Sequence, residues 1–125
     1  MKFTLESSSA AAVRSVANGQ FLIGDQVWSD PIALTPGGVL QDWAAPSLAA
    51  LSVESLSSLL ELDPELLIVG TGSQQVLPDR DLMFGMARSG VGLELMDTPA
   101  AARTFNVLLG EGRSVAAVFY PTENS

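Results

Sequence analysis

The 125-residue chain contains no cysteine and no histidine. It therefore cannot build a disulfide, a thiolate nucleophile, a Ser-His-Asp triad or a zinc finger from its own side chains. Basic residues are also scarce, since six Lys and Arg stand against fourteen Asp and Glu and the formal net charge is −8. A general nucleic-acid-binding protein needs a basic surface to displace counterions from phosphates, so that class is disfavoured. We expect no cofactor, no metal and no nucleic-acid partner.

Long apolar runs are missing as well. No run approaches the roughly 18 apolar residues of a membrane helix, and residues 1–12 lack the apolar stretch of a signal peptide, so we expect a soluble, cytoplasmic protein. The chain is nevertheless rich enough in apolar residues for a core, with 47% hydrophobic residues and a mean hydropathy of +0.31. A single domain over residues 1–125 is predicted, with an ordered core of about 12–121 and loosely held ends at 7–12 and 122–125.

The first half of the chain has the pattern of antiparallel β-structure. Turn signals recur every 6 to 12 residues, among them Asn18-Gly19 and Gly24-Asp25. The short apolar segments between them predict strands at 13–17, 20–23, 27–28, 32–34 and 39–43. Pro31 and Pro36 place their segments at a sheet edge or at strand ends. This half is predicted to form a β meander.

The second half alternates between strands and helices. Ser52 is expected to cap a helix over 53–62, Pro78 to lie in the first turn of a helix over 78–89, and Thr98 to cap a helix over 99–109. Apolar runs predict buried strands of one sheet at 66–70, 91–96 and 115–120, of which the second carries one charge, Glu94. Because a β-α-β-α-β order builds a parallel sheet through crossover connections, the fold class is α/β.

A glycine-containing turn is the first candidate site. Gly70, Thr71, Gly72 and Ser73 directly follow the strand predicted at 66–70. Glycines at such a position let backbone N–H groups turn toward an anion. The sequence departs from a dinucleotide fingerprint, because Gln75 stands where a further glycine belongs. Two interpretations stay open: a tight turn below the sheet end, or a contact with a ligand or partner.

The helix predicted after Thr98 carries the second candidate site. Ala101, Phe105, Leu108 and Leu109 share one face and form its core side, while Arg103 points nearly opposite with Asn106 beside it. Arg103 either binds an anion near the helix start or is satisfied by Asp97 or Glu94. If strands 66–70 and 91–96 are neighbours, both candidates lie at one sheet edge, where ligands of parallel sheets gather. The candidate site then comprises Gly70, Thr71, Gly72, Ser73, Asp97, Thr98, Arg103 and Asn106.

Three segments occur together and in order: Leu67–Gly72 (LIVGTG), Gly90–Thr98 (GVGLELMDT) and Ala102–Leu108 (ARTFNVL). With them the chain resembles the small Mth-domain family of unknown function, to which the mitochondrial respiratory complex I assembly factor 3 and the adipogenesis-associated Mth-domain protein are related. The resemblance covers roughly residues 12–121 and implies a three-layered α/β fold around a mixed sheet. It supplies no catalytic residue set. The positions that match the family's motifs are Gly70, Gly72, Asp97, Thr98, Arg103 and Asn106.

Three classes of function follow from these observations. The resemblance, together with the absence of histidine and cysteine, favours a protein-interaction or assembly-factor-like module with a protein partner. The glycine turn and Arg103 favour a small-anion or nucleotide-binding protein. An enzyme that uses Asp97 and Arg103 is the third class, and it requires a carboxylate whose pKa is raised by burial. An exposed apolar patch would distinguish the first class, and a concave pocket around Thr71, Ser73 and Arg103 the second.

Overall fold

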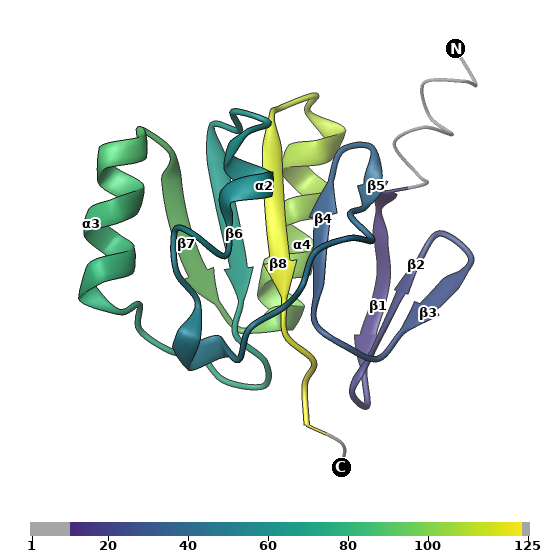
Figure 1. Cartoon of the computed structure of the whole chain (residues 1–125). Helices are drawn as coiled ribbons and strands as arrows, with labels where there is room; N and C mark the ends of the chain where they lie inside the picture. The colour runs from purple at the N-terminus through teal and green to yellow at the C-terminus, as the bar shows by residue number, and fades with distance from the viewer. Residues whose placement is uncertain (1–10, 124–125) are drawn as a thin grey trace.

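The computed structural model describes residues 11–123, and Figure 1 shows their arrangement. Its elements in chain order are β1 (Val13–Ala17), β2 (Gln20–Ile23), β3 (Gln26–Trp28), β4 (Ile32–Thr35), β5 (Gly38–Val39), the 3-10 helix η1 (Leu48–Ala50), α2 (Ser57–Leu60), β6 (Leu66–Gly70), α3 (Arg80–Ser89), β7 (Gly92–Met96), α4 (Thr98–Gly110) and β8 (Val115–Phe119). None of the described helices is long and apolar enough to cross a bilayer.

A five-stranded mixed sheet forms the centre of the molecule, with strand order β5-β4-β8-β6-β7. Strand β6 runs parallel to both β7 and β8, whereas β4 is antiparallel to β8 and β5. The prediction that segments 66–70, 91–96 and 115–120 belong to one sheet is confirmed. The predicted α/β class is confirmed with it, because α3 and α4 make the two crossovers between these strands.

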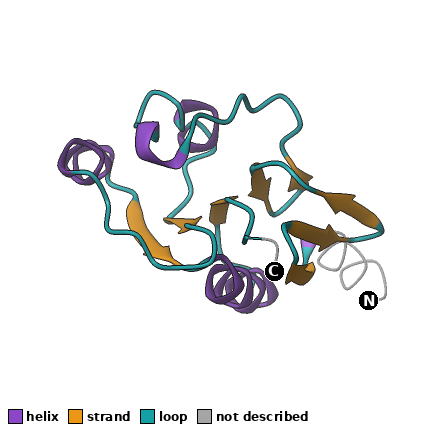
Figure 2. Cartoon of the chain, turned by 90° about the horizontal axis from the view of Figure 1, so that it is seen from below, coloured by secondary structure: helices purple, strands orange, loops and turns teal. Residues whose placement is uncertain are grey.

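Helices cover both faces of this sheet, as the resemblance implies, and the layers are visible in Figure 2. On one face, α4 and the β1-β2-β3 sheet pack against alternate residues of β4, β6 and β8, among them Ile68 and Phe119. On the other face, α2, α3 and the segment around Leu51 pack against the intervening residues, such as Leu67 and Val118. Because side chains along a strand alternate between the two faces of the sheet, β6 and β8 contribute to two separate hydrophobic cores.

The predicted meander is divided between two sheets. Strands β1, β2 and β3 form a three-stranded antiparallel sheet, while β4 and β5 join the five-stranded sheet. The chain changes sheets at Asp30-Pro31, where Pro31 precedes β4 and cannot donate a ladder hydrogen bond. The strand predicted over 39–43 is wrong beyond Val39, because β5 ends there and a turn follows at 41–42.

The helix predicted over 53–62 is also wrong in extent. Only Ser57–Leu60 is α-helical, although Leu56 and Leu59 are buried. Ser52 caps a turn instead of a helix: its Oγ accepts from the Ser55 N–H at 3.1 Å, and the Ser55 Oγ donates to the Ser52 carbonyl at 2.9 Å. Serine hydroxyls compete with the helical ladder for backbone groups, which explains the short helix.

Two smaller differences concern α3 and β7. Asp79 is the N-cap of α3, so the helix begins at Arg80 and Pro78 lies outside it. Strand β7 is not buried as predicted, because it is the edge strand of the sheet and exposes Gly92 and Glu94.

The expectation of loose ends at 7–12 and 122–125 falls mainly on residues outside the described part, which are 7–10 and 124–125. Ala11 is fully buried, and the Thr122 Oγ1 accepts a hydrogen bond from the Gly19 N–H at 3.3 Å.

Candidate functional site

The two candidate segments at the strand ends do meet in space. In the parallel register of β6 and β7, Gly70 is paired with Met96, so both strands end at the same edge of the sheet. The Thr71 N–H donates to the Met96 carbonyl at 2.8 Å, which joins the glycine turn to the segment that enters α4. Residues 70–73 and 97–98 therefore lie side by side, the arrangement that their positions in the sequence predict.

Thr98 is the centre of this junction. Its side chain is completely buried, and its Oγ1 donates to the Tyr120 carbonyl at 2.6 Å and accepts from the Gly72 N–H at 2.8 Å. One hydroxyl thus connects α4, the turn after β6 and the segment after β8. The N–H groups of Thr71 and Gly72 are both engaged inside the protein and do not point to a ligand.

Close packing at Gly70 and backbone conformation at Gly72 explain why the turn contains these two glycines. A Cβ at Gly70 would lie 2.9 Å from both Phe119 Cδ1 and Thr98 Oγ1, so no side chain fits there. Gly72 has a φ of +97°, a conformation that residues with a Cβ rarely adopt. These features accord with the interpretation of Gly70–Ser73 as a tight turn below the sheet end.

Asp97, not Thr98, is the N-cap of α4. Its carboxylate accepts from the Ala100 N–H at 2.8 Å, and its backbone carbonyl accepts from the Ala101 N–H at 2.9 Å. The Thr98 N–H donates to the Gly72 carbonyl at 2.8 Å, and Pro99 has no N–H to donate. Aspartate is among the best N-caps, so its preference over threonine is ordinary. Every N–H in the first turn of α4 therefore has a partner within the chain.

Arg103 and Asn106 lie on the side of α4 that faces β1. Asn106 clamps the strand, because its Oδ1 accepts from the Val13 N–H at 2.9 Å and its Nδ2 donates to the Val13 carbonyl at 2.8 Å. Arg103 is exposed, as predicted, and lines a cavity of about 190 Å³ together with Arg14 and Pro99. The described residues form one ion pair, Arg113 with Glu65 at 3.1 Å, so neither Asp97 nor Glu94 satisfies Arg103.

The segment after β8 closes over the strand ends. The Tyr120 N–H donates to the Gly70 carbonyl at 2.9 Å, and the Glu123 N–H donates to the Ser73 Oγ at 2.7 Å. Tyr120 is buried, and its hydroxyl donates to the Pro46 carbonyl at 3.0 Å. Burial raises the pKa of Tyr120 to about 12. Residues 120–123 thus occupy the edge of the sheet at which the sequence predicts a ligand.

Larger concave surfaces than the cavity beside α4 lie between α3 and residues 48–54. A cavity of about 530 Å³ lies along α3 and residues 49–54, and one of about 400 Å³ lies at the N-terminal end of the same helix. None of the sequence patterns described above points to this region. The available signal was the composition of the helix, since Met83 and Phe84 add apolar side chains outside the stripe of Leu82 and Met86.

Comparison with known proteins places the chain among proteins that share this architecture. The NADH dehydrogenase (ubiquinone) 1 alpha subcomplex assembly factor 3 of Danio rerio is 34% identical over 118 residues, which cover 93% of this chain and 67% of the relative. Assembly factors of the same name from other vertebrates match similarly, and the chain spans about two thirds of their length.

Solved structures share the fold of this chain. A solution structure from Xanthomonas campestris superposes with a TM-score of 0.79 at 34% identity, covering 87% of this chain and 83% of the other. A Mth938-like domain from Bordetella pertussis gives 0.77 at 28% identity, covering 94% and 89%. The resemblance read from the three sequence segments is confirmed. Residues 13–120 match the family described as "Protein of unknown function (DUF498/DUF598)", and the chain belongs to that family.

Proposed function

We propose that the chain is a protein-interaction module that assists the assembly of a larger complex. The relatives named as complex I assembly factors support an assembly-like role, because they match nearly the whole of this chain. Support from the structure itself comes from the distribution of exposed apolar side chains, which concentrates on one side of the molecule.

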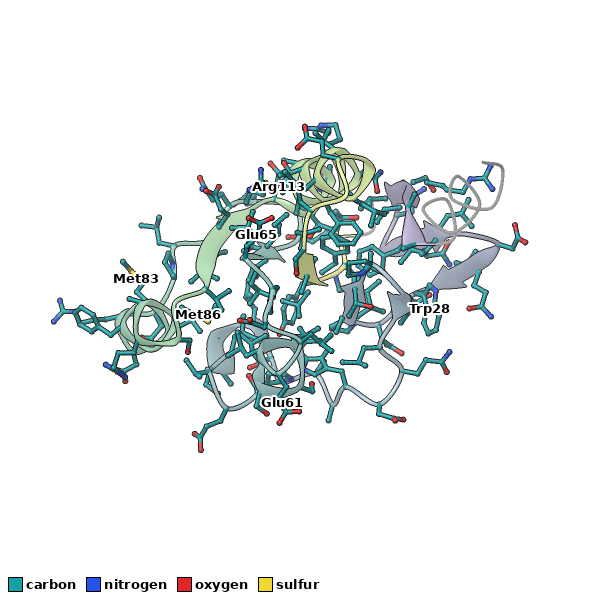
Figure 3. All side chains as sticks on the ribbon, turned by 90° about the horizontal axis from the view of Figure 1, so that it is seen from above. Trp28, Glu61, Glu65, Met83, Met86 and Arg113 are labelled. Atoms are coloured by element: carbon teal, nitrogen blue, oxygen red, sulfur yellow. The ribbon has the colours of Figure 1, made fainter. Side chains whose placement is uncertain are left out.

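The observation that carries the proposal is the surface of residues 76–84. Seven large apolar side chains are exposed in the described part of the chain, and four of them, Val76, Leu77, Met83 and Phe84, lie within these nine residues. Leu77 is 82% exposed. Figure 3 shows Met83 pointing away from the body of the protein, while Met86 of the same helix points toward the sheet. Clustered exposed apolar side chains mark interaction sites more often than scattered ones do.

The test is capture of partners from the native host by the full chain and by matched variants. We expect Leu77→Ser/Phe84→Ser to lose the captured protein, because both side chains are exposed and contribute to contact rather than to the core. Val107→Ser is the control: it removes an apolar side chain that is 59% exposed, close to the 56% of Phe84, from the opposite side of the molecule. Capture that survives in the double variant, or is lost equally in the control, would contradict the proposal. Thermal melting of all variants shows that each one is folded.

A second candidate, binding of a small anion, is favoured by the cavity beside α4. Arg14 and Arg103 both line it, and its lining contains no carboxylate. Inorganic phosphate is the probe, followed by backbone amide shifts of the full chain. Shifts at residues 13–16 and 99–106 that disappear in Arg103→Ala would support this candidate, and unchanged spectra at millimolar phosphate would exclude it.

A further inference from the structure

The two cavities beside α3 are parts of one groove. Both are lined by Ala49, Leu51, Asp79 and Leu82, so they adjoin along the side of the helix. The groove runs from Val76–Pro78 at the N-terminal end of α3 to Arg88-Ser89 at its C-terminal end. Ten helical residues span about 15 Å, enough for a short segment of another protein.

Close packing at the middle of the helix holds the two walls of the groove together. Gly85 is buried, and a Cβ built on it would collide with Cγ2 of Val53. The absence of a side chain at this position lets the segment around Val53 approach the helix directly. The contact between Gly85 and Val53 thus sets how closely the two walls of the groove approach.

The two halves of the groove differ in chemistry. Its N-terminal half is apolar and is lined by Leu48, Leu51, Val76, Leu77, Leu82 and Leu95, with Asp79 as the charged residue. The other half, which is the larger cavity, carries three carboxylates, Glu54, Asp79 at the N-cap of α3 and Asp81 in its first turn, against one guanidinium, Arg88 in its last turn. None of these four groups forms an ion pair with another described residue. A bound segment thus meets apolar side chains in the smaller cavity and, beside it around the first turn of α3, an excess of negative charge.

We infer that this groove binds a basic amphipathic segment of a partner protein. Apolar side chains of the segment enter the half lined by leucines, and a lysine or arginine approaches Glu54 and Asp81. The inference rests on the proposed function and names the chemistry of the partner. The net charge of −8 acts in the same direction, because it attracts basic segments and repels a second copy of the chain.

The test uses two synthetic peptides of 14 residues that place leucines on one helical face. One peptide carries lysines on the other face, and its twin carries glutamates. Fluorescence anisotropy with the full chain gives both affinities, and amide shifts locate the bound peptide. We expect the lysine peptide to bind at residues 48–54 and 76–89, and the glutamate twin to bind at least roughly tenfold more weakly.

Charge variants separate a specific groove from general attraction to an acidic protein. Glu54→Gln/Asp81→Asn and the control Glu61→Gln/Asp63→Asn each remove two negative charges, so both have a net charge of −8 + 2 = −6. All four side chains are exposed, and the control pair does not line the groove. We expect the lysine peptide to bind roughly three- to tenfold more weakly to the groove variant than to the control.

Equal binding of the two peptides, equal effects of the two charge variants, or shifts outside the groove would overturn the inference. These failures are distinguishable from failure of the proposed function. Capture that still depends on Leu77 and Phe84 would leave the interaction module in place while removing the basic segment as its partner.

Discussion

On one face of the five-stranded sheet, α4 buries Ala101, Phe105 and Leu109 and has every N–H of its first turn hydrogen-bonded within the chain. On the other face, α3 lies beside the edge strand β7 (Figures 1 and 2), and it leaves the Met83 and Phe84 side chains exposed to solvent. Both helices are crossover helices with a buried stripe. They differ at their surfaces: the first-turn N–H groups of α4 are hydrogen-bonded within the chain, whereas α3 exposes large apolar side chains.

This difference separates structural polar groups from groups available for binding. Of the residues that match the family's motifs, Gly70, Gly72, Thr98 and Asn106 bond to one another, to β1 or to the segment after β8, and Asp97 caps α4. The α3 side contains the groove and four of the seven exposed large apolar side chains of the described residues. Polar residues at strand ends can therefore hold a fold together without contacting any ligand.

The largest expected effect is on the α4 side. Phe105 is fully buried and packs edge-on against Phe119, with ring centroids 6.1 Å apart. We expect Phe105→Ala to lower the free energy of unfolding by about 3–5 kcal/mol, because the variant loses buried area and leaves a cavity. Urea denaturation measures this. A decrease in the free energy of unfolding of less than about 1 kcal/mol would show that Phe105 is not part of a closely packed core.

Removal of the Thr98 hydroxyl is the next largest change. Thr98→Val leaves the Gly72 N–H and the Tyr120 carbonyl without their partner, and we expect a loss of about 1–3 kcal/mol. Thr98→Ser keeps the hydroxyl and is the matched control, expected to be clearly more stable than the valine variant. If the two variants unfold at the same urea concentration, the hydroxyl does not hold the junction.

Tyr120 offers a pH-dependent test of the same junction, and it is the chain's single tyrosine. Its pKa is raised to about 12 by burial, above the value near 10 of an unfolded chain. The neutral phenol is the form that the fold favours, so its contribution to stability is complete below about pH 10 and is lost as pH rises toward 12. Absorbance at alkaline pH should show phenolate forming late in native protein and near pH 10 in denaturant. Native ionisation near pH 10 would indicate an exposed side chain.

The smallest expected effect on stability belongs to Arg103. Its side chain is exposed and takes no part in the ion pairs of the described residues. We expect Arg103→Ala to melt close to the unsubstituted protein, within about 1 kcal/mol. A decrease in the free energy of unfolding of about 3 kcal/mol would place the guanidinium in a buried ion pair. Arg103 would then stabilise the fold and would not be available for binding.

The sequence was most informative where apolar runs are long and their caps clear. Segments 66–70 and 115–120 are buried strands because their apolar residues must face two cores at once. The helix near 53–62 could not be predicted correctly, since Ser52 and Ser55 form local hydrogen bonds with each other that compete with the helical ladder. The division of the meander into two sheets depends on β4 pairing with β8, a contact between residues more than 80 positions apart.

The candidate site shows the same contrast. Proximity of residues 70–73 to 97–98 follows from parallel strands of one sheet, and the exposure of Arg103 follows from helical periodicity. The partners of the polar groups do not follow, because they come from Val13 and from residues 120–123, which no local pattern connects to α4. The groove beside α3 depends on how residues 48–54 pack at Gly85, again a long-range contact.

Hydrogen exchange of the chain, free and bound to the partner captured from its host, locates the surface that the partner covers. We expect slower exchange in the complex at residues 48–54 and 76–89, with residues 70–73 and 97–110 unchanged. Protection confined to 70–73 and 97–110, with none along α3, would contradict this expectation and return the recognition surface to the strand ends.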